Sequence, residues 1–365
     1  TQLKKPSGVW IMAYTTIDNP ELFFQCKLYT GNATDDTAIT LDGDENMQPD
    51  WVWIKDRTNG NHNRLYDSVR GATKVIYSSL SNAEGTASTG LKSFDSDGFT
   101  LGTGSDENGN SANFVSWNWK AGTAFSNDAS ATSVGTIDSS GSINTDAGIS
   151  IISFTGTGSA ATIAHGLGKE VDCIAIKNRN DSAQWSFYHR SLGGTKYMAF
   201  NSTSAAGTAS TQWNNTDPTS SVFSVGTSNN TNDSSDGMIA YCFSSIKGYS
   251  KVDGSYTGNG NADGPFIYTG FRPAFVMIKK ATGAANNWCI GDNKRSLFNI
   301  VFNYLLADRS DVDESGSGQE RDFLSNGFKI RNSNNMLNTS GETYIYMAFA
   351  EAPFTNSNGV PCNAR

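Results

Sequence analysis

The chain is poor in the residue types on which many catalytic and metal sites depend. It has three histidines, and its five cysteines form no CxxC pair or other regular spacing. So few imidazoles leave little capacity for an acid–base or metal centre, and the cysteine pattern indicates neither a zinc site nor a disulfide framework. A Gly-x-Ser-x-Gly elbow and a phosphate-binding loop are absent as well. We therefore expect no cofactor, no metal and no enzymatic activity.

Charge is also scarce. Charged residues make up 17% of the chain, the net charge is −8, and lysine and arginine form no run. Nucleic acids and anionic membrane surfaces are bound mainly through clusters of basic residues, so neither is an expected partner. No apolar run reaches the 18 residues of a membrane-spanning helix, and we predict no membrane insertion.

What the chain has is glycine, aromatic residues and small polar residues. Its 37 glycines and 11% aromatics suit many short strands joined by turns. Residues 51–54, 173–176 and 275–278 are apolar at every position, which is typical of strands covered on both faces. The best helix candidate, 297–307, contains enough β-branched and aromatic residues to suit a strand equally well. The fold class that we predict is all-β.

A sequence repeat organises the chain. Each copy opens with an aromatic residue followed by Thr-Gly, and Ile-Lys follows, with the Lys 26, 23 and 23 residues after that aromatic. The opening motifs are Tyr29-Thr30-Gly31-Asn32, Phe154-Thr155-Gly156-Thr157 and Tyr256-Thr257-Gly258-Asn259, and the Ile-Lys pairs are Ile54-Lys55, Ile176-Lys177 and Ile278-Lys279. A period near 100 residues is the size of a small domain. We therefore predict three independent tandem β-sandwiches, of the jelly-roll or concanavalin-like kind.

The repeat also sets the expected domain boundaries. The three sandwiches are predicted at 22–120, 149–247 and 248–354, followed by a C-terminal tail at 355–365. The stretch 121–148 is rich in Ser, Thr, Asn and Gly, and it is either a linker or an edge strand of the second copy.

Residues 1–21 precede the first copy. Within them, Trp10 to Tyr14 resembles the closing strands of the copies and stands at their usual distance from the next opening motif. It is either the end of an upstream copy, since the first residue is Thr rather than Met, or a strand that completes copy one or pairs with a neighbouring subunit. In each case we expect it to extend or close a sheet, because an unpaired apolar strand aggregates.

Several polar and aromatic residues recur from copy to copy. A functional interpretation makes the Lys, Asp and Arg positions a binding or catalytic cluster, whereas a structural one makes them an ion pair that ties two strands together. We favour the structural interpretation, because features repeated in every copy usually serve the fold. An aromatic residue in each closing strand is predicted to be a core residue of its own sandwich. These recurring positions are Lys55, Lys177, Lys279, Asp67, Arg70, Asp292, Arg295, Trp117, Tyr241 and Phe349, with His189-Arg190 replacing Asp-x-x-Arg in copy two.

Two further constellations occur once. Trp213 stands beside Asn214 and Asn215, and an aromatic ring next to amides can form a shallow sugar site. The alternative is a Trp that covers the end of the sandwich. Asp311, Asp313, Ser315 and Asp322 have the spacing of a calcium loop but lack its twelfth-position Glu and its flanking helices, so we favour a solvated loop.

The third copy resembles a module of large tail-associated proteins of bacteriophages, especially phages of marine bacteria. The resemblance covers roughly residues 22–354. In copy three it depends on Phe271-Arg272-Pro273-Ala274-Phe275-Val276-Met277-Ile278-Lys279, Trp288-x-Ile290-x-Asp292-x-x-Arg295, Phe323 to Phe328, and Tyr344 to Phe354. Gly156 to Gly168 of copy two and Trp117-Asn118-Trp119-Lys120 of copy one are similar to the same family.

This resemblance implies a virion protein assembled in the host cytoplasm, with no catalytic residues. We expect a non-enzymatic structural or adhesion protein in a tail fibre or other receptor-facing appendage. Its expected partners are other virion proteins, further copies of itself in a trimer, and a glycan or protein of the host cell surface. The alternatives are a capsid or tail decoration protein and a depolymerase of host polysaccharide. The depolymerase requires a cleft lined by convergent carboxylates.

Overall fold

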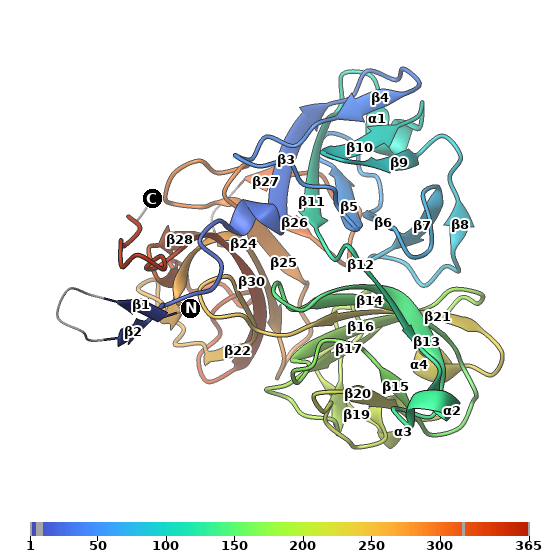
Figure 1. The fold of residues 1–365 in the computed structure, drawn as a ribbon. Coiled ribbons are helices and arrows are strands. Elements are labelled where there is room, and N and C mark those ends of the chain that lie inside the picture. The colour runs from blue at the N-terminus through green and yellow to red at the C-terminus, as the bar shows by residue number, and fades with distance from the viewer. Residues whose placement is uncertain (1, 5–9, 316–317, 364–365) are drawn as a thin grey trace.

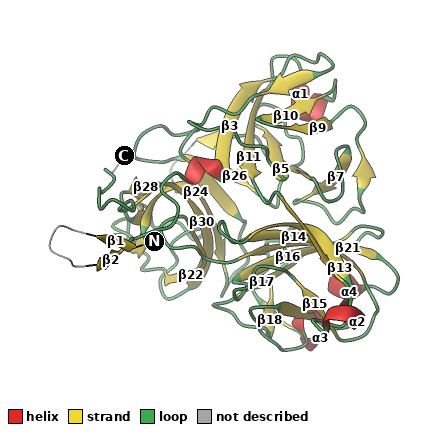
Figure 2. Cartoon of the chain, in the orientation of Figure 1, coloured by secondary structure: helices red, strands yellow, loops and turns green. Residues whose placement is uncertain are grey.

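The computed structural model describes residues 2–4, 10–315 and 318–363. Strands dominate it and the helices are single turns (Figure 2). The all-β prediction is therefore confirmed. The helical turns are η1 (Pro20–Leu22), α1 (Ser105–Asn108), α2 (Ala129–Thr132), α3 (Ser210–Trp213) and α4 (Asn229–Asn232).

Each copy of the repeat, called a module from here on, is built on one six-stranded antiparallel sheet. In module 1 (residues 22–120) the strand order is β3 (Phe24–Thr30), β11 (Asn113–Trp119), β5 (Trp51–Asp56), β6 (Arg64–Asp67), β7 (Lys74–Tyr77) and β8 (Gly85–Thr86). A smaller sheet accompanies it, made of β4 (Thr37–Ile39), β10 (Gly98–Leu101) and β9 (Leu91–Asp95).

Module 2 (residues 121–247) begins with the stretch that the sequence left as linker or edge strand. It forms two strands of the module's sheet, so the edge-strand alternative is correct. The order is β12 (Thr123–Asn127), β13 (Ser139–Asn144), β14 (Ile149–Thr155), β21 (Gly237–Phe243), β16 (Cys173–Asn178) and β17 (Ser186–His189). The smaller pairs are β15 (Ala161–Ala164) with β20 (Val222–Val225), and β18 (Lys196–Tyr197) with β19 (Gly207–Thr208).

Module 3 (residues 248–354) repeats the plan of module 1. Its six-stranded sheet has the order β22 (Ser250–Thr257), β30 (Thr343–Pro353), β24 (Phe271–Lys280), β25 (Cys289–Asp292), β26 (Asn303–Leu306) and β27 (Glu314–Ser315). The smaller sheet contains β23 (Phe266–Tyr268), β29 (Gly327–Ile330) and β28 (Arg321–Leu324). The helix candidate at 297–307 therefore contains a strand, β26.

The middle strands β5, β16 and β24 are covered on both faces, as their sequences predicted. In β5, Val52 and Ile54 pack toward the small sheet of module 1, in one hydrophobic cluster with Phe99. Trp51 and Trp53 point the other way, into a cluster that contains residues of all three modules. The same alternation holds in β16 and β24. Ile54, Ile176 and Ile278 thus occupy equivalent places.

The three modules are not independent, and this corrects the tandem arrangement that the repeat predicted. They surround a common centre as three lobes (Figure 1), and one face of every six-stranded sheet contributes to a single core there. Aromatic rings join each pair of modules. Trp51 stacks on Tyr241 at 4.6 Å between centroids, Phe243 contacts Phe349 at 5.8 Å, and Trp119 contacts Phe275 at 5.8 Å.

Strand register also corrects one repeat position. Trp117, Tyr241 and Phe349 are all buried, as predicted, but they belong to the shared core rather than to separate sandwiches. Lys55 pairs with Val115 and Lys279 with Ile345, so Met347 rather than Phe349 is level with Trp117. Phe349 is level with Trp119, two residues further on. The sequence match was displaced because aromatic residues alternate through this strand.

The N-terminal segment pairs with itself. Strand β2 (Trp10–Met12) pairs with β1 (Gln2–Lys4) in a two-stranded sheet, not with module 1. Residues 5–9, which the prediction included in part, lie outside the described residues. The chain then runs along module 3, where the Tyr14 hydroxyl donates to the Gly270 carbonyl at 2.9 Å. The segment therefore forms a strand pair, and of its predicted partners copy one is wrong, while an upstream copy and a neighbouring subunit stay predictions.

Candidate functional site

The two Asp-x-x-Arg pairs lie where modules meet. Asp67 and Arg70 form an ion pair at 2.5 Å with both side chains fully buried, and Asp292 and Arg295 form one at 2.6 Å. Each aspartate also accepts a hydrogen bond from another module. The Tyr241 hydroxyl donates to Asp67 at 2.5 Å, and Trp117 Nε1 donates to Asp292 at 3.1 Å. The predicted ion pair is confirmed, and it joins modules as well as strands.

The third junction uses different chemistry. His189 of module 2 occupies the place of Asp67 and Asp292, because it pairs with the same position of the middle strand. Met347 of module 3 is level with Trp117 and Tyr241 in their strands, and its sulfur lies 3.7 Å from Sγ of Cys173, the residue that pairs with His189. Burial lowers the pKa of His189 to about 4, so the ring is neutral near pH 7. This junction is held without a buried charge.

The repeated lysines do not join these ion pairs, so the Lys–Asp–Arg binding or catalytic cluster, which was the less favoured interpretation, does not form. Lys55 Nζ donates to the main-chain carbonyls of Asp56, Asn61 and Ser310, and the last of these belongs to module 3. Lys279 Nζ likewise donates to Thr203 of module 2 at 2.8 Å. Burial lowers the pKa of Lys55, Lys177 and Lys279 to about 8 in each case. These lysines hold loops of neighbouring strands and modules in place.

One recurring residue was missed by the sequence reasoning. Asn108, Asn232 and Asn338 each accept a hydrogen bond from the backbone N–H just after the Thr-Gly of the opening motif, at 2.8–3.0 Å. Each amide nitrogen also donates to two backbone carbonyls, one in the opening turn and one six residues before the Asn. The signal was available in the sequence as an Asn that precedes every closing strand.

Trp213 cannot be the sugar platform that the sequence suggested. Its side chain is 1% exposed and packs edge-on against Tyr188 in the core of module 2. The ring ends α3 and faces inward, because the left-handed backbone of Asn214 turns the chain outward immediately afterwards. Asn214 and Asn215 are exposed, so the buried ring and the amides do not form one surface. The alternative of a Trp that closes the module is the correct one.

The calcium-loop candidate does not converge either. Asp313 binds Arg57 of module 1 and Arg295, both at less than 3.0 Å, while Asp311 pairs with Arg309. Asp322 lies in β28 and pairs with Arg331. The carboxylates are therefore used in separate ion pairs, and the loop serves the contact between modules 1 and 3 rather than standing free in solvent.

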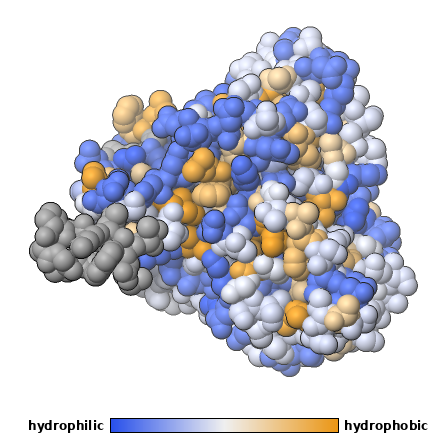
Figure 3. Space-filling model, viewed as in Figure 1, coloured by the Kyte–Doolittle hydropathy of each residue, from blue (hydrophilic) through white to orange (hydrophobic). Residues whose placement is uncertain are grey.

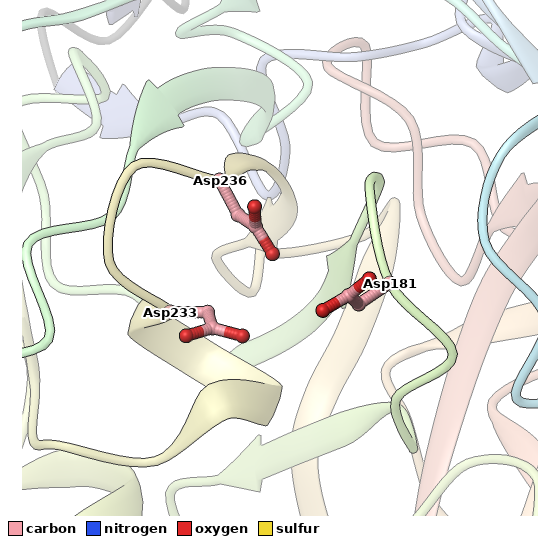
Figure 4. A group of neighbouring side chains, drawn as sticks. All are labelled: Asp181, Asp233 and Asp236. Atoms are coloured by element: carbon pink, nitrogen blue, oxygen red, sulfur yellow. The ribbon is translucent and has the colours of Figure 1, made fainter.

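One group of carboxylates does converge, in module 2. Asp181 follows β16, and Asp233 and Asp236 lie between α4 and β21, with their oxygens within 4.8 Å of one another (Figure 4). The buried Asn178 amide donates to Asp236 at 2.8 Å. Oxygen ligands at this spacing could hold a hard divalent cation. Asp181 is exposed, and none of the larger grooves found among the described residues is lined by this group.

Module 3 has an open groove between β22 and β23, the edge strands of its two sheets. It measures about 360 Å³. Its walls combine aromatic, charged and hydroxyl side chains with backbone from both strands. The lining residues are Lys251, Asp253, Gly254, Ser255, Tyr256, Phe266, Ile267, Tyr268 and Tyr346.

Comparison with known families gives one match, to a domain of unknown function designated DUF7483, over residues 19–353. The chain belongs to the DUF7483 family. The match spans all three modules, in agreement with a single shared core. No curated protein and no solved structure matches the chain. Among the described residues of this DUF7483 protein, no helix is long and apolar enough to span a bilayer.

Proposed function

We propose that this DUF7483 protein is a non-enzymatic structural and adhesion protein of a phage virion, placed in a tail fibre or another receptor-facing appendage. The observation that supports it best is the use of the repeated polar residues. The buried Asp–Arg pairs, the lysines and the closing-strand aromatics all hold three modules around one core. The side chains that recur among the modules thus stabilise the assembly of the three modules. The tail-associated resemblance of the same strands points to the virion.

The surface is compatible with this role. On the face shown in Figure 3, apolar residues lie in separate patches among hydrophilic ones. Exposed apolar side chains nevertheless gather at one loop of module 3, at Leu297, Phe298, Ile300 and Phe302. Phe298 is 76% exposed. A patch of this kind is typical of a surface that contacts another protein, as a subunit of a trimeric appendage does.

The depolymerase alternative is less well supported. It needs two carboxylates at a glycosidic bond inside a substrate cleft. The carboxylates that converge, Asp181, Asp233 and Asp236, lie outside the larger grooves of the described chain. The groove of module 3 contains a single carboxylate, Asp253, which is paired with Lys251.

Electron microscopy of virions with a tagged copy of this chain tests the location. We expect the label on a tail fibre or other distal appendage, and soluble chain should compete with virions for adsorption to host cells. Label on the capsid or tail tube would support the decoration alternative. Release of reducing ends from host polysaccharide by the purified chain would overturn the non-enzymatic proposal.

A further inference from the structure

The groove of module 3 has no counterpart in module 2. There the equivalent edge strand, β14, is covered by β13, which pairs with it over residues 139–144. In module 3 nothing in the described chain pairs with the outer edge of β22, and the same holds for β3 in module 1, so module 3 differs from module 1 in the side chains along this edge. A ligand site is usually added to one copy of a repeated scaffold. The groove of module 3 is therefore the candidate ligand site.

Two aromatic rings that modules 1 and 2 lack border this groove. Phe266 and Tyr268 stand two residues apart on the same face of β23, and they are 45% and 55% exposed. The equivalent positions of module 2, by pairing register, are the small residues Thr162 and Ala164. The Tyr268 hydroxyl is held 3.0 Å from that of Tyr14. Fixed, exposed rings offer flat apolar surface for stacking.

Tyr346 adds a buried polar group that faces the groove. It is 3% exposed, and its ring crosses Gly254, where a Cβ atom would lie 2.1 Å from the ring. In modules 1 and 2 this strand position holds the small residues Ser116 and Ala240. Within the described part of the chain, the Tyr346 hydroxyl has no hydrogen-bond partner. Its oxygen is not among the fully buried atoms that lack a partner, so it is accessible from the groove and can bond to a ligand.

Hydrogen-bonding side chains complete the opposite wall. Lys251 and Asp253 form an ion pair at 2.8 Å, and Asp253 also accepts from the Ser245 hydroxyl at 2.7 Å. Ser255 is exposed and also lines the groove. These groups provide donors and acceptors within a groove that also has two aromatic faces.

We infer that the groove lined by Phe266, Tyr268, Tyr346, Lys251 and Asp253 binds a saccharide chain, with sugar rings on the aromatic faces and hydroxyls on the polar wall. The inference rests on the proposed adhesion function and names the class of receptor. Rings stack on the apolar face of a sugar, and its hydroxyls both donate and accept.

An extended peptide added to the edge of β22 fits less well. The pairing of β22 with β30 shifts between Lys251 and Gly254, which marks a bulge in this edge strand. Bulges and charged residues are the features that keep sheet edges from pairing with another strand. The bulge begins at Lys251, which is itself charged and lines the groove, so both features are present at this edge.

The test is binding of the full chain to an array of defined bacterial polysaccharides and oligosaccharides, with dissociation constants measured for those that bind. Tyr346→Phe removes the free hydroxyl and should weaken binding about tenfold, the effect of one lost hydrogen bond. Phe266→Ala should weaken it at least as much. Val360→Ala is the control, because it removes an exposed apolar side chain that lies outside both the groove and the protein-contact patch. Thermal melting verifies that each variant is folded.

Equal affinities for wild type, Tyr346→Phe and Phe266→Ala would overturn the inference, and so would an array on which nothing binds. Virion attachment that survives periodate treatment of the host surface but not proteinase treatment would also overturn it, in favour of a protein receptor. None of these results affects the proposed virion location, which the tagged copy tests separately.

Discussion

The residues at three equivalent positions differ together from one junction between modules to the next. Asp67 and Arg70 face the Tyr241 hydroxyl, and Asp292 and Arg295 face the Trp117 indole. At the third junction a His, Leu192 and Met347 occupy the same places. A buried carboxylate is tolerated only with charged and hydrogen-bonding partners. Where the closing strand offers a thioether, which has no proton to donate, the carboxylate and its arginine are both absent.

Removing one donor should therefore matter only at the charged junctions. Tyr241→Phe deletes the hydrogen bond to Asp67 and should lower the free energy of unfolding by about 1–3 kcal/mol, because a buried carboxylate loses a partner. Met347→Leu, the matched change at the neutral junction, keeps volume and removes no such bond, and should cost less than about 1.5 kcal/mol. Urea unfolding measures both. A Tyr241→Phe loss no greater than that of Met347→Leu would contradict the assigned role.

The buried histidines predict acid sensitivity. Burial lowers the pKa of His165 and of His189 to about 4, against 6.5 for the unperturbed group. Between pH 6.5 and 4 the unfolded chain thus binds protons that the folded chain does not, so stability falls as pH falls through this window. The loss is up to about 3 kcal/mol for each histidine.

His165 allows a direct check of this pH dependence. Its Nδ1 accepts from the Leu167 N–H, so this nitrogen carries no proton, and Nε2 lies 3.2 Å from the Thr219 carbonyl, which accepts from it. His165→Asn retains an acceptor and a donor but does not titrate. Melting temperatures from pH 7 to 4 should fall less steeply for this variant than for wild type. Parallel curves would show that His165 does not contribute.

Among the elements, the opening turn is the most strictly repeated. The glycine of each Thr-Gly lies against the backbone that precedes the closing strand. A Cβ atom on Gly31, Gly156 or Gly258 would stand 2.0–2.3 Å from a carbonyl oxygen. The presence of a glycine at this position in all three modules therefore has a steric cause, and an Asn amide oxygen accepts from the next backbone N–H in each turn.

Gly258→Ala should separate the opening turn from the segment before β30. We expect a loss of about 1–3 kcal/mol in the free energy of unfolding, since backbone atoms cannot yield as a flexible side chain does. Gly60→Ala is the control, because its added Cβ would meet one atom at 3.6 Å. Denaturant titration compares the two. Equal effects would mean that the turn relaxes without strain.

Much of this element level was predictable from the sequence. Residues 51–54 alternate between two apolar faces because two different cores cover β5, and the pattern showed both. The lysines were misassigned, because main-chain carbonyls are acceptors that no sequence pattern reveals. The polar neighbours of Trp213 left two interpretations open, a sugar platform and a cover for the module, and one left-handed residue after it separates the buried ring from the exposed amides.

At the scale of the whole molecule, the sequence predicted the three repeats but not how they assemble around one core. A strand with two apolar faces must be covered twice, and the sequence does not say whether the second cover comes from its own module or from another. In this chain the second cover of each middle strand comes from the other two modules. The groove of module 3 could not be predicted for a similar reason, because its lining residues come from β22, β23 and β30 and lie as far apart in the chain as Lys251 and Tyr346.

The shared core predicts that the three modules unfold together. Module 2 buries Tyr241 and Phe243 against rings of modules 1 and 3, so a fragment of residues 121–247 alone would expose that face to water. We expect the complete chain to unfold in a single calorimetric transition with equal calorimetric and van't Hoff enthalpies. The isolated fragment should bind a hydrophobic dye and lack a cooperative melt, as expected when specific packing is lost. Three resolved transitions in the complete chain, or a fragment that melts cooperatively at the temperature of the whole, would restore the picture of independent tandem domains.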